Sequence, residues 1–173
     1  MKWYERMPGV ENDEGHIRGF FEEYRFLSNF HECNVMWKSL MFKSSEAAYQ
    51  AAKSKYPEVW LQFMRMTPSQ AKRRGRIIDI REDWDNIRID VMADICTDKF
   101  LRNPDLADKL KATGNKHLEE TNWWGDTFWG VCKGVGKNNL GIVLMAIREQ
   151  LNTEEYEKIR EIIQENEGRY KDY

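Results

Sequence analysis

Residues 45–53, SEAAYQAAK, contain four polar side chains of different chemistry. They are Glu46, Tyr49, Gln50 and Lys53. Their positions, i, i+3, i+4 and i+7, place them on one face of a helix. The alanines between them favour a helix and would let its other faces pack closely. This row could present an acid, a phenol, an amide and an amine to one cleft, and a solvated helix face is the alternative.

A second candidate is the segment 122–137, NWWGDTFWGVCKGVGK, which breaks the helical pattern around it. It places Asp126 between Trp124 and Trp129. Aromatic rings beside a carboxylate suit a flat heterocycle that carries a sugar, because the rings stack and the carboxylate bonds a hydroxyl or a ring N–H. The alternative is that the aromatic rings close a small core, which we expect for at least one of Trp123 and Trp124.

Two further segments could contact phosphate. Residues 134–141, GVGKNNLG, precede an apolar helix, where backbone N–H groups can form an anion site. Residues 72–76, KRRGR, form a basic cluster on a predicted helix. The candidate contacts are Gly136, Asn139 and Arg76. The alternatives are a flexible loop with a capping asparagine and a solvated helix end.

Hydrophobic periodicity predicts a mostly α chain with a small β element, an α+β fold in one domain. We expect short strands near 17–21, 33–37 and 41–43. We expect helices near 45–55, 58–66, 68–76, 83–101, 104–113 and 140–151, and a last helix after Thr153. Residues 1–16 are polar and irregular, so we interpret them as a tail and residues 17–173 as the domain.

Composition excludes several classes of protein. The net charge of −2 over 173 residues argues against binding driven by nucleic-acid phosphates. The three cysteines and three histidines show no metal-ligand spacing, so we expect no metal and no cofactor. No apolar stretch approaches the roughly 20 residues that cross a bilayer, and residues 1–16 lack a secretory apolar region. We therefore expect a cytoplasmic protein without a membrane partner.

The order of motifs resembles that of the NADAR family, also called the YbiA-like family. The match runs in order from about Phe20 to Leu151. Its motifs are FLSNF at 26–30, SEAAYQAAK at 45–53, AKRRGR at 71–76, DW at 83–84, DTFWG at 126–130 and GKNNLG at 136–141. The resemblance implies a compact, mostly α domain that hydrolyses N-glycosidic bonds. It implies either riboflavin-pathway ribosylaminopyrimidine intermediates or ADP-ribosylated guanine as the substrate.

The resemblance also implies functional residues. It places them at Glu46, Trp84, Asp126 and Trp129. From the charges that the reaction develops, we expect Glu46 and Asp126 on either side of the scissile bond, and Trp84 and Trp129 on the two faces of the base. Lys53 would either bind phosphate or form a Schiff base with a ring-opened sugar. The remaining binding candidates are Asn29, Phe30, Tyr49, Gln50, Arg76, Gly136 and Asn139.

Three functions are compatible with these features. The first is an N-glycosidase acting on a phosphoribosyl or ADP-ribosyl N-glycoside, with ADP-ribosylated nucleic acid as one form of substrate. The second is a non-catalytic binder of ADP-ribose-like nucleotides. The third is a helical module that binds protein or nucleic acid through residues 72–76.

Overall fold

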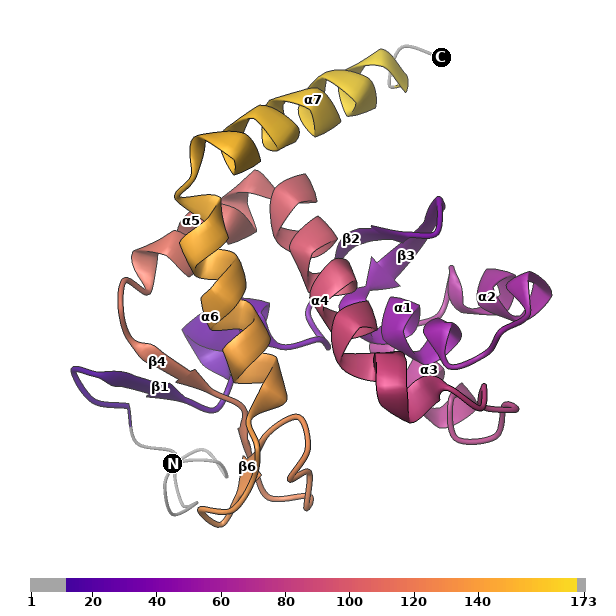
Figure 1. Cartoon of the computed structure of the whole chain (residues 1–173), viewed down its shortest axis with the longest axis horizontal. Helices are drawn as coiled ribbons and strands as arrows, with labels where there is room; N and C mark the ends of the chain where they lie inside the picture. The colour runs from indigo at the N-terminus through magenta and orange to yellow at the C-terminus, as the bar shows by residue number, and fades with distance from the viewer. Residues whose placement is uncertain (1–11, 171–173) are drawn as a thin grey trace.

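The computed structural model describes residues 12–170. Helices dominate the structure and three small sheets accompany them (Figure 1). The fold confirms the predicted α+β class. The strands are β1 His16–Arg18, β2 Glu32–Trp37, β3 Leu40–Ser44, β4 His117–Glu119, β5 Thr121–Asn122 and β6 Val131–Cys132. The helices are the 3-10 helix η2 Glu22–Leu27, α1 Ser45–Ala52, α2 Pro57–Phe63, α3 Pro68–Arg74, α4 Trp84–Arg102, α5 Pro104–Ala112, α6 Asn139–Leu151 and α7 Glu154–Tyr170.

Helix α1 lies at the centre of one half of the molecule. Its N-cap Ser44 accepts a hydrogen bond from the Ala47 N–H (3.0 Å), which satisfies a free donor of the first turn. Its four alanines are completely buried, and the helix packs against α2, α3 and α4. Because alanine lets helix backbones approach closely, this packing fixes the direction of the polar row on α1.

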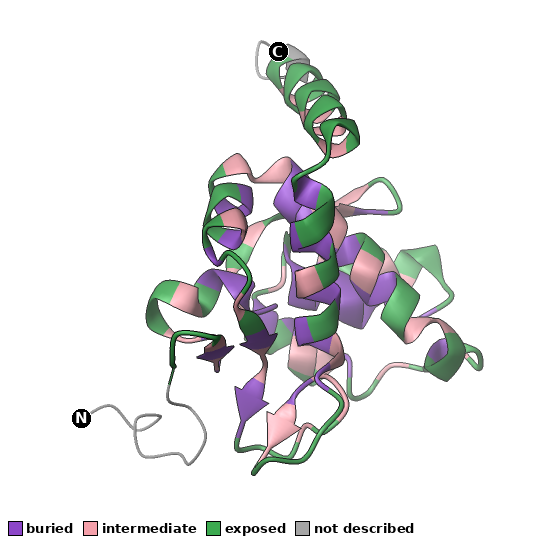
Figure 2. Ribbon diagram, turned by 60° about the vertical axis from the view of Figure 1, so that its left-hand side comes forward, coloured by how far each residue is buried: buried purple, intermediate pink, exposed green. Residues whose placement is uncertain are grey.

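Helices α4 and α6 form the other part of the core. The predicted stripe of α6 is buried, and Leu144 and Leu151 are completely enclosed. Gly141 permits contact with strand β4, since a Cβ there would lie 2.1 Å from the Leu118 carbonyl oxygen. Helix α7 is mostly exposed (Figure 2). No helix in the stretch 12–170 is long and apolar enough to cross a membrane.

The sheets are small, and one of them, formed by β1 and β4, joins distant parts of the sequence. Strands β1 and β4 pair in parallel, as do β5 and β6, whereas β2 and β3 form an antiparallel hairpin. The sequence predicted β1, β2 and β3 approximately and missed η2, β4, β5 and β6. The missed strands have two or three residues, too few for a period-two pattern.

The predicted boundary between tail and domain falls at His16. In the structure His16 already belongs to β1 and pairs with His117, and the Asp13 carboxylate accepts a hydrogen bond from Arg18 (2.9 Å). Residues 1–11 lie outside the described residues, so the division into a tail and one domain stays a prediction.

Candidate active site

One pocket of about 440 Å³ brings together the two candidate segments, α1 and the loop that follows β5. It is bounded by η2, α1, α3 and the segment 120–129. Eight predicted site residues line it: Asn29, Phe30, Glu46, Tyr49, Gln50, Lys53, Asp126 and Trp129. Four others do not: Arg76, Trp84, Gly136 and Asn139. The acid from the first third of the chain and the aspartate from the last third therefore share a cavity.

Glu46 is only 7% exposed and sits in the first turn of α1. Its N–H donates to the Asn29 carbonyl (3.1 Å), and the Gln50 amide donates to its Oε1 (2.8 Å). Burial raises the pKa of Glu46, while the bond from Gln50 and the nearby Lys72 and Lys53 act in the opposite direction. A buried carboxyl with a perturbed pKa in a pocket is suited to proton exchange.

The Gln50 side chain packs against Gly75, the glycine inside the basic cluster. A Cβ at Gly75 would lie 1.9 Å from Gln50 Oε1 and 2.7 Å from Gln50 Cδ, so a larger residue there would displace the Gln50 side chain. The glycine therefore leaves room for the amide that supports Glu46. The side of α3 that carries buried Pro68 and Ala71 faces inward, and Lys72 beside it lines the pocket. Arg76 is exposed, and its predicted phosphate contact stays a prediction.

Lys53 follows the last turn of α1. Burial lowers the pKa of Lys53, and the neighbouring Glu46 partly offsets this effect. Its Nζ lies 5.6 Å from the centre of the Tyr49 ring. A larger share of its amine is therefore neutral than in an exposed lysine, and only the neutral amine can act as a nucleophile.

Asp126 is held in place by its own loop. Its Oδ1 accepts hydrogen bonds from the N–H groups of Phe128 (3.1 Å) and Trp129 (2.8 Å). The buried Asn122 side chain donates to the Asp126 carbonyl (2.7 Å) and accepts from its N–H (3.0 Å). Asn139 donates to the Phe128 carbonyl (2.9 Å), so it positions this loop and does not line the pocket. Nothing in the sequence pattern singled out Asn122.

The aromatic residues are arranged differently from the expected sandwich. Tyr49 lies between the two tryptophans, 5.1 Å from Trp84 and 5.4 Å from Trp129 between ring centres. The Trp129 indole N–H donates to the Tyr49 hydroxyl (3.1 Å). Trp84 is buried behind Tyr49, so the two tryptophans do not face an open slot. Burial raises the pKa of Tyr49 to about 12, which keeps the phenol neutral.

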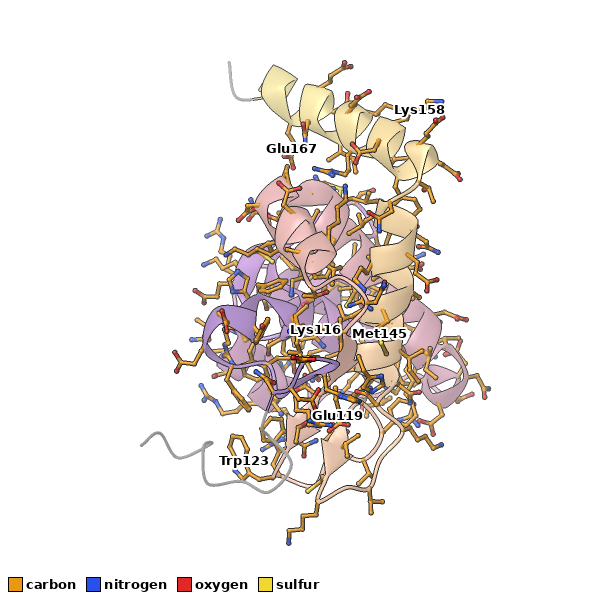
Figure 3. The ribbon with its side chains drawn as sticks, turned by 90° about the vertical axis from the view of Figure 1, so that its left-hand side faces the viewer. Lys116, Glu119, Trp123, Met145, Lys158 and Glu167 are labelled. Atoms are coloured by element: carbon orange, nitrogen blue, oxygen red, sulfur yellow. The ribbon has the colours of Figure 1, made fainter. Side chains whose placement is uncertain are left out.

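The mouth of the pocket carries exposed aromatic rings. Trp123 and Trp124 are each 47% exposed and meet edge to face at 4.5 Å, so neither closes a core as we expected for one of them. Trp123 lies at the edge of the molecule far from α7 (Figure 3). Lys72 Nζ lies 5.8 Å from the Trp124 ring and 5.3 Å from that of Phe30. The mouth therefore combines π faces with a positive charge.

The NADAR domain family model matches residues 15–152. The chain belongs to the NADAR family. The family predicted from the order of motifs is thereby confirmed.

Several relatives of this NADAR chain carry functional names. It is 32% identical over 143 residues to the N-glycosidase YbiA of Escherichia coli, covering 77% of this chain and 85% of that protein. It is 32% identical over 138 residues to an N-glycosidase of Nostoc punctiforme, covering 76% of this chain and 88% of that protein. The match to a riboflavin biosynthesis protein of Vibrio vulnificus is 38% identical over 136 residues, 75% of this chain, but spans only 36% of that relative.

A solved structure shares the fold. The NMR structure of Escherichia coli YbiA superimposes with a TM-score of 0.71 at 29% identity, covering 83% of this chain and 89% of that chain.

The NADAR pocket also contains residues that sequence reasoning missed. Arg25 and Glu120 line it, from η2 and from the link between β4 and β5. Neither stands out in the sequence, because each lies among other charged residues. Gly136 lies outside the pocket and packs closely against Gly130, since a Cβ there would lie 2.1 Å from the Gly130 carbonyl oxygen. Its predicted substrate contact stays a prediction.

Proposed function

We propose that this NADAR protein hydrolyses the N-glycosidic bond of a phosphoribosyl or ADP-ribosyl N-glycoside. The candidate substrates are ribosylaminopyrimidine intermediates of the riboflavin pathway and ADP-ribosylated guanine, free or in nucleic acid. One observation supports this most: Asp126 lines the same pocket as Glu46 and Lys53 of α1, although it lies far from both in sequence. The class of enzyme, an N-glycosidase, agrees with the names of several relatives.

The pocket matches the charges that such a reaction develops. Breaking the C–N bond places positive charge on C1′ and negative charge on the leaving base. A carboxylate beside C1′ stabilises the cation, and a second carboxylate can take a proton from water. We assign the activation of water to Glu46, because its carboxyl is buried and has a raised pKa. We assign the binding of the ribose hydroxyls to Asp126, whose carboxylate is fixed by two N–H donors.

The side chains at the mouth of the pocket suit the phosphate and the base of such a substrate. Lys72 and Arg25 supply positive charge for phosphate. The exposed rings of Trp123 and Trp124 offer faces on which a base can stack.

A non-catalytic binder of ADP-ribose-like nucleotides is the second candidate, and this mouth of aromatic and cationic side chains favours it. Such a binder would hold the nucleotide but would not hydrolyse it. Incubation with a panel of N-ribosides, including riboflavin-pathway intermediates and ADP-ribosylated guanine, separates the two functions. We expect chromatography to show free base and free sugar in equal amounts for at least one substrate. Binding without release for every substrate would contradict hydrolysis and support the binder.

A further inference from the structure

Glu120 lines the pocket but has no role in the steps above. Its position is fixed through the backbone: its N–H donates to Asn138 Oδ1 (3.0 Å), and its carbonyl accepts from the Val131 N–H (2.9 Å). Gly130 packs directly against it, since a Cβ there would lie 2.1 Å from the Glu120 carbonyl oxygen and 2.9 Å from its Cγ. The glycine of the DTFWG motif therefore leaves the space that Glu120 occupies at the pocket wall.

One oxygen of the Glu120 carboxyl lacks a partner. Its Oε2 is buried and accepts no hydrogen bond from any residue in the range 12–170. A buried, unpaired carboxylate oxygen is costly, and protonation removes most of that cost. A protonated Oε2 would have a hydrogen to donate and no hydrogen-bond partner among residues 12–170.

Charged groups from the surrounding elements act on Glu120. They are Arg25 of η2, Glu46 of α1, Lys72 of α3, Lys99 of α4 and Asp126 of the loop after β5. Burial is the largest influence and raises the pKa of Glu120, and the carboxylates of Asp126 and Glu46 raise it further. Arg25 and Lys72 oppose this only partly, and the resulting pKa is about 8. Near neutral pH, Glu120 is therefore mainly a neutral acid.

We propose that Glu120 is a further catalytic residue, the acid that protonates the departing base. This inference rests on the proposed N-glycosidase function. As the C1′–N bond breaks, its electron pair passes to the base nitrogen, which takes the proton of Glu120. The oxygen of water then bonds to C1′, either directly or after C1′ has passed through an imine with Lys53, and the released water proton passes to Glu46. Proton exchange with solvent then restores Glu120 to the acid and Glu46 to the carboxylate.

Glu120 thus acts as the general acid, and Glu46 acts as the general base. The division resembles that of other carboxyl pairs in which different surroundings give the two groups different roles. The Gln50 amide stabilises the charged form of Glu46, whereas Oε2 of Glu120 accepts no hydrogen bond from residues 12–170 that would stabilise its charged form. The base would lie on the β4–β5 side of the pocket, close to the exposed tryptophans.

The test compares Glu120→Gln with Glu119→Gln. Glu119 is adjacent in sequence (Figure 3), accepts a hydrogen bond from the Thr121 hydroxyl (2.6 Å) and does not line the pocket. We expect wild-type kcat/KM for base release to fall as the pH rises above about 8. Glu120→Gln should lower kcat/KM at neutral pH by about 10²–10⁴-fold and remove this alkaline decline. Glu119→Gln should keep the wild-type profile.

Thermal unfolding gives a second measurement that needs no turnover. The pKa of Glu120 is higher in the folded than in the unfolded state, so wild-type stability falls as the pH rises from about 4.3, the ordinary glutamate value, to about 8. Glutamine does not titrate. The Tm of Glu120→Gln minus that of wild type should therefore increase over this range and level off above it.

The outcomes are distinguishable. An unchanged alkaline decline in Glu120→Gln, or a Tm difference independent of pH, overturns the role of Glu120 alone. Failure of the wild-type protein to release base from any substrate overturns the proposed function itself, before any variant is compared.

Discussion

Replacing Glu46 by glutamine is expected to lower kcat/KM for base release by about 10²–10⁴-fold, the usual contribution of a general base. Glutamine has nearly the same shape, so the pocket and its contacts with ligand should persist. It cannot take a proton from water, and it carries no charge to stabilise the positive C1′. Affinity for the substrate should therefore stay close to that of wild type.

Chromatography of released base and calorimetry of substrate binding measure the two parts of this prediction. Glu58→Gln is a matched control, because Glu58 is exposed on α2 and away from the pocket. Full base release by Glu46→Gln would show that another group activates water. Loss of binding together with release would indicate a role in substrate affinity.

Borohydride added during turnover is expected to attach the sugar covalently to Lys53. An N-glycoside of an exocyclic amine can open to an imine at C1′, and the neutral amine of Lys53 can displace the base from that imine. Water then hydrolyses the new imine, which frees the aldehyde and restores the lysine. Lys53 is suited to this role because burial lowers its pKa, and Glu46 is close enough to affect that pKa.

Mass spectrometry of the digested protein would locate the adduct. Lys53→Arg keeps the positive charge but cannot form an imine, so it should show no adduct and lose most of its turnover. Lys55, exposed two residues further along, should carry none in the wild-type protein. Trapping that leaves Lys53 unmodified would contradict the Schiff base and favour phosphate binding by this residue.

The features predicted well from sequence are those carried by local patterns. The i, i+3, i+4, i+7 row on α1 lines the pocket, because a helix fixes the relative directions of its own side chains. The apolar stripe of α6 is buried for the same reason. Asp126 was found because a carboxylate among tryptophans in a glycine-rich loop is an unusual combination.

The features missed depend on contacts between distant residues. Glu120 enters the pocket because Val131 bonds its carbonyl and Gly130 leaves room beside it, and neither feature leaves a local signal. The position of Tyr49 between Trp84 and Trp129 likewise depends on three separate elements. Sequence spacing shows which side chains share a helix face, but it does not show which ring occupies the space between two others.

A crystal structure of the Glu46→Gln variant with an intact N-glycoside would test the central claim most directly. The account predicts that C1′ lies between residue 46 and Asp126, with the scissile nitrogen within hydrogen-bonding distance of Glu120. A substrate bound elsewhere, or bound in this pocket with C1′ remote from both positions, would contradict it.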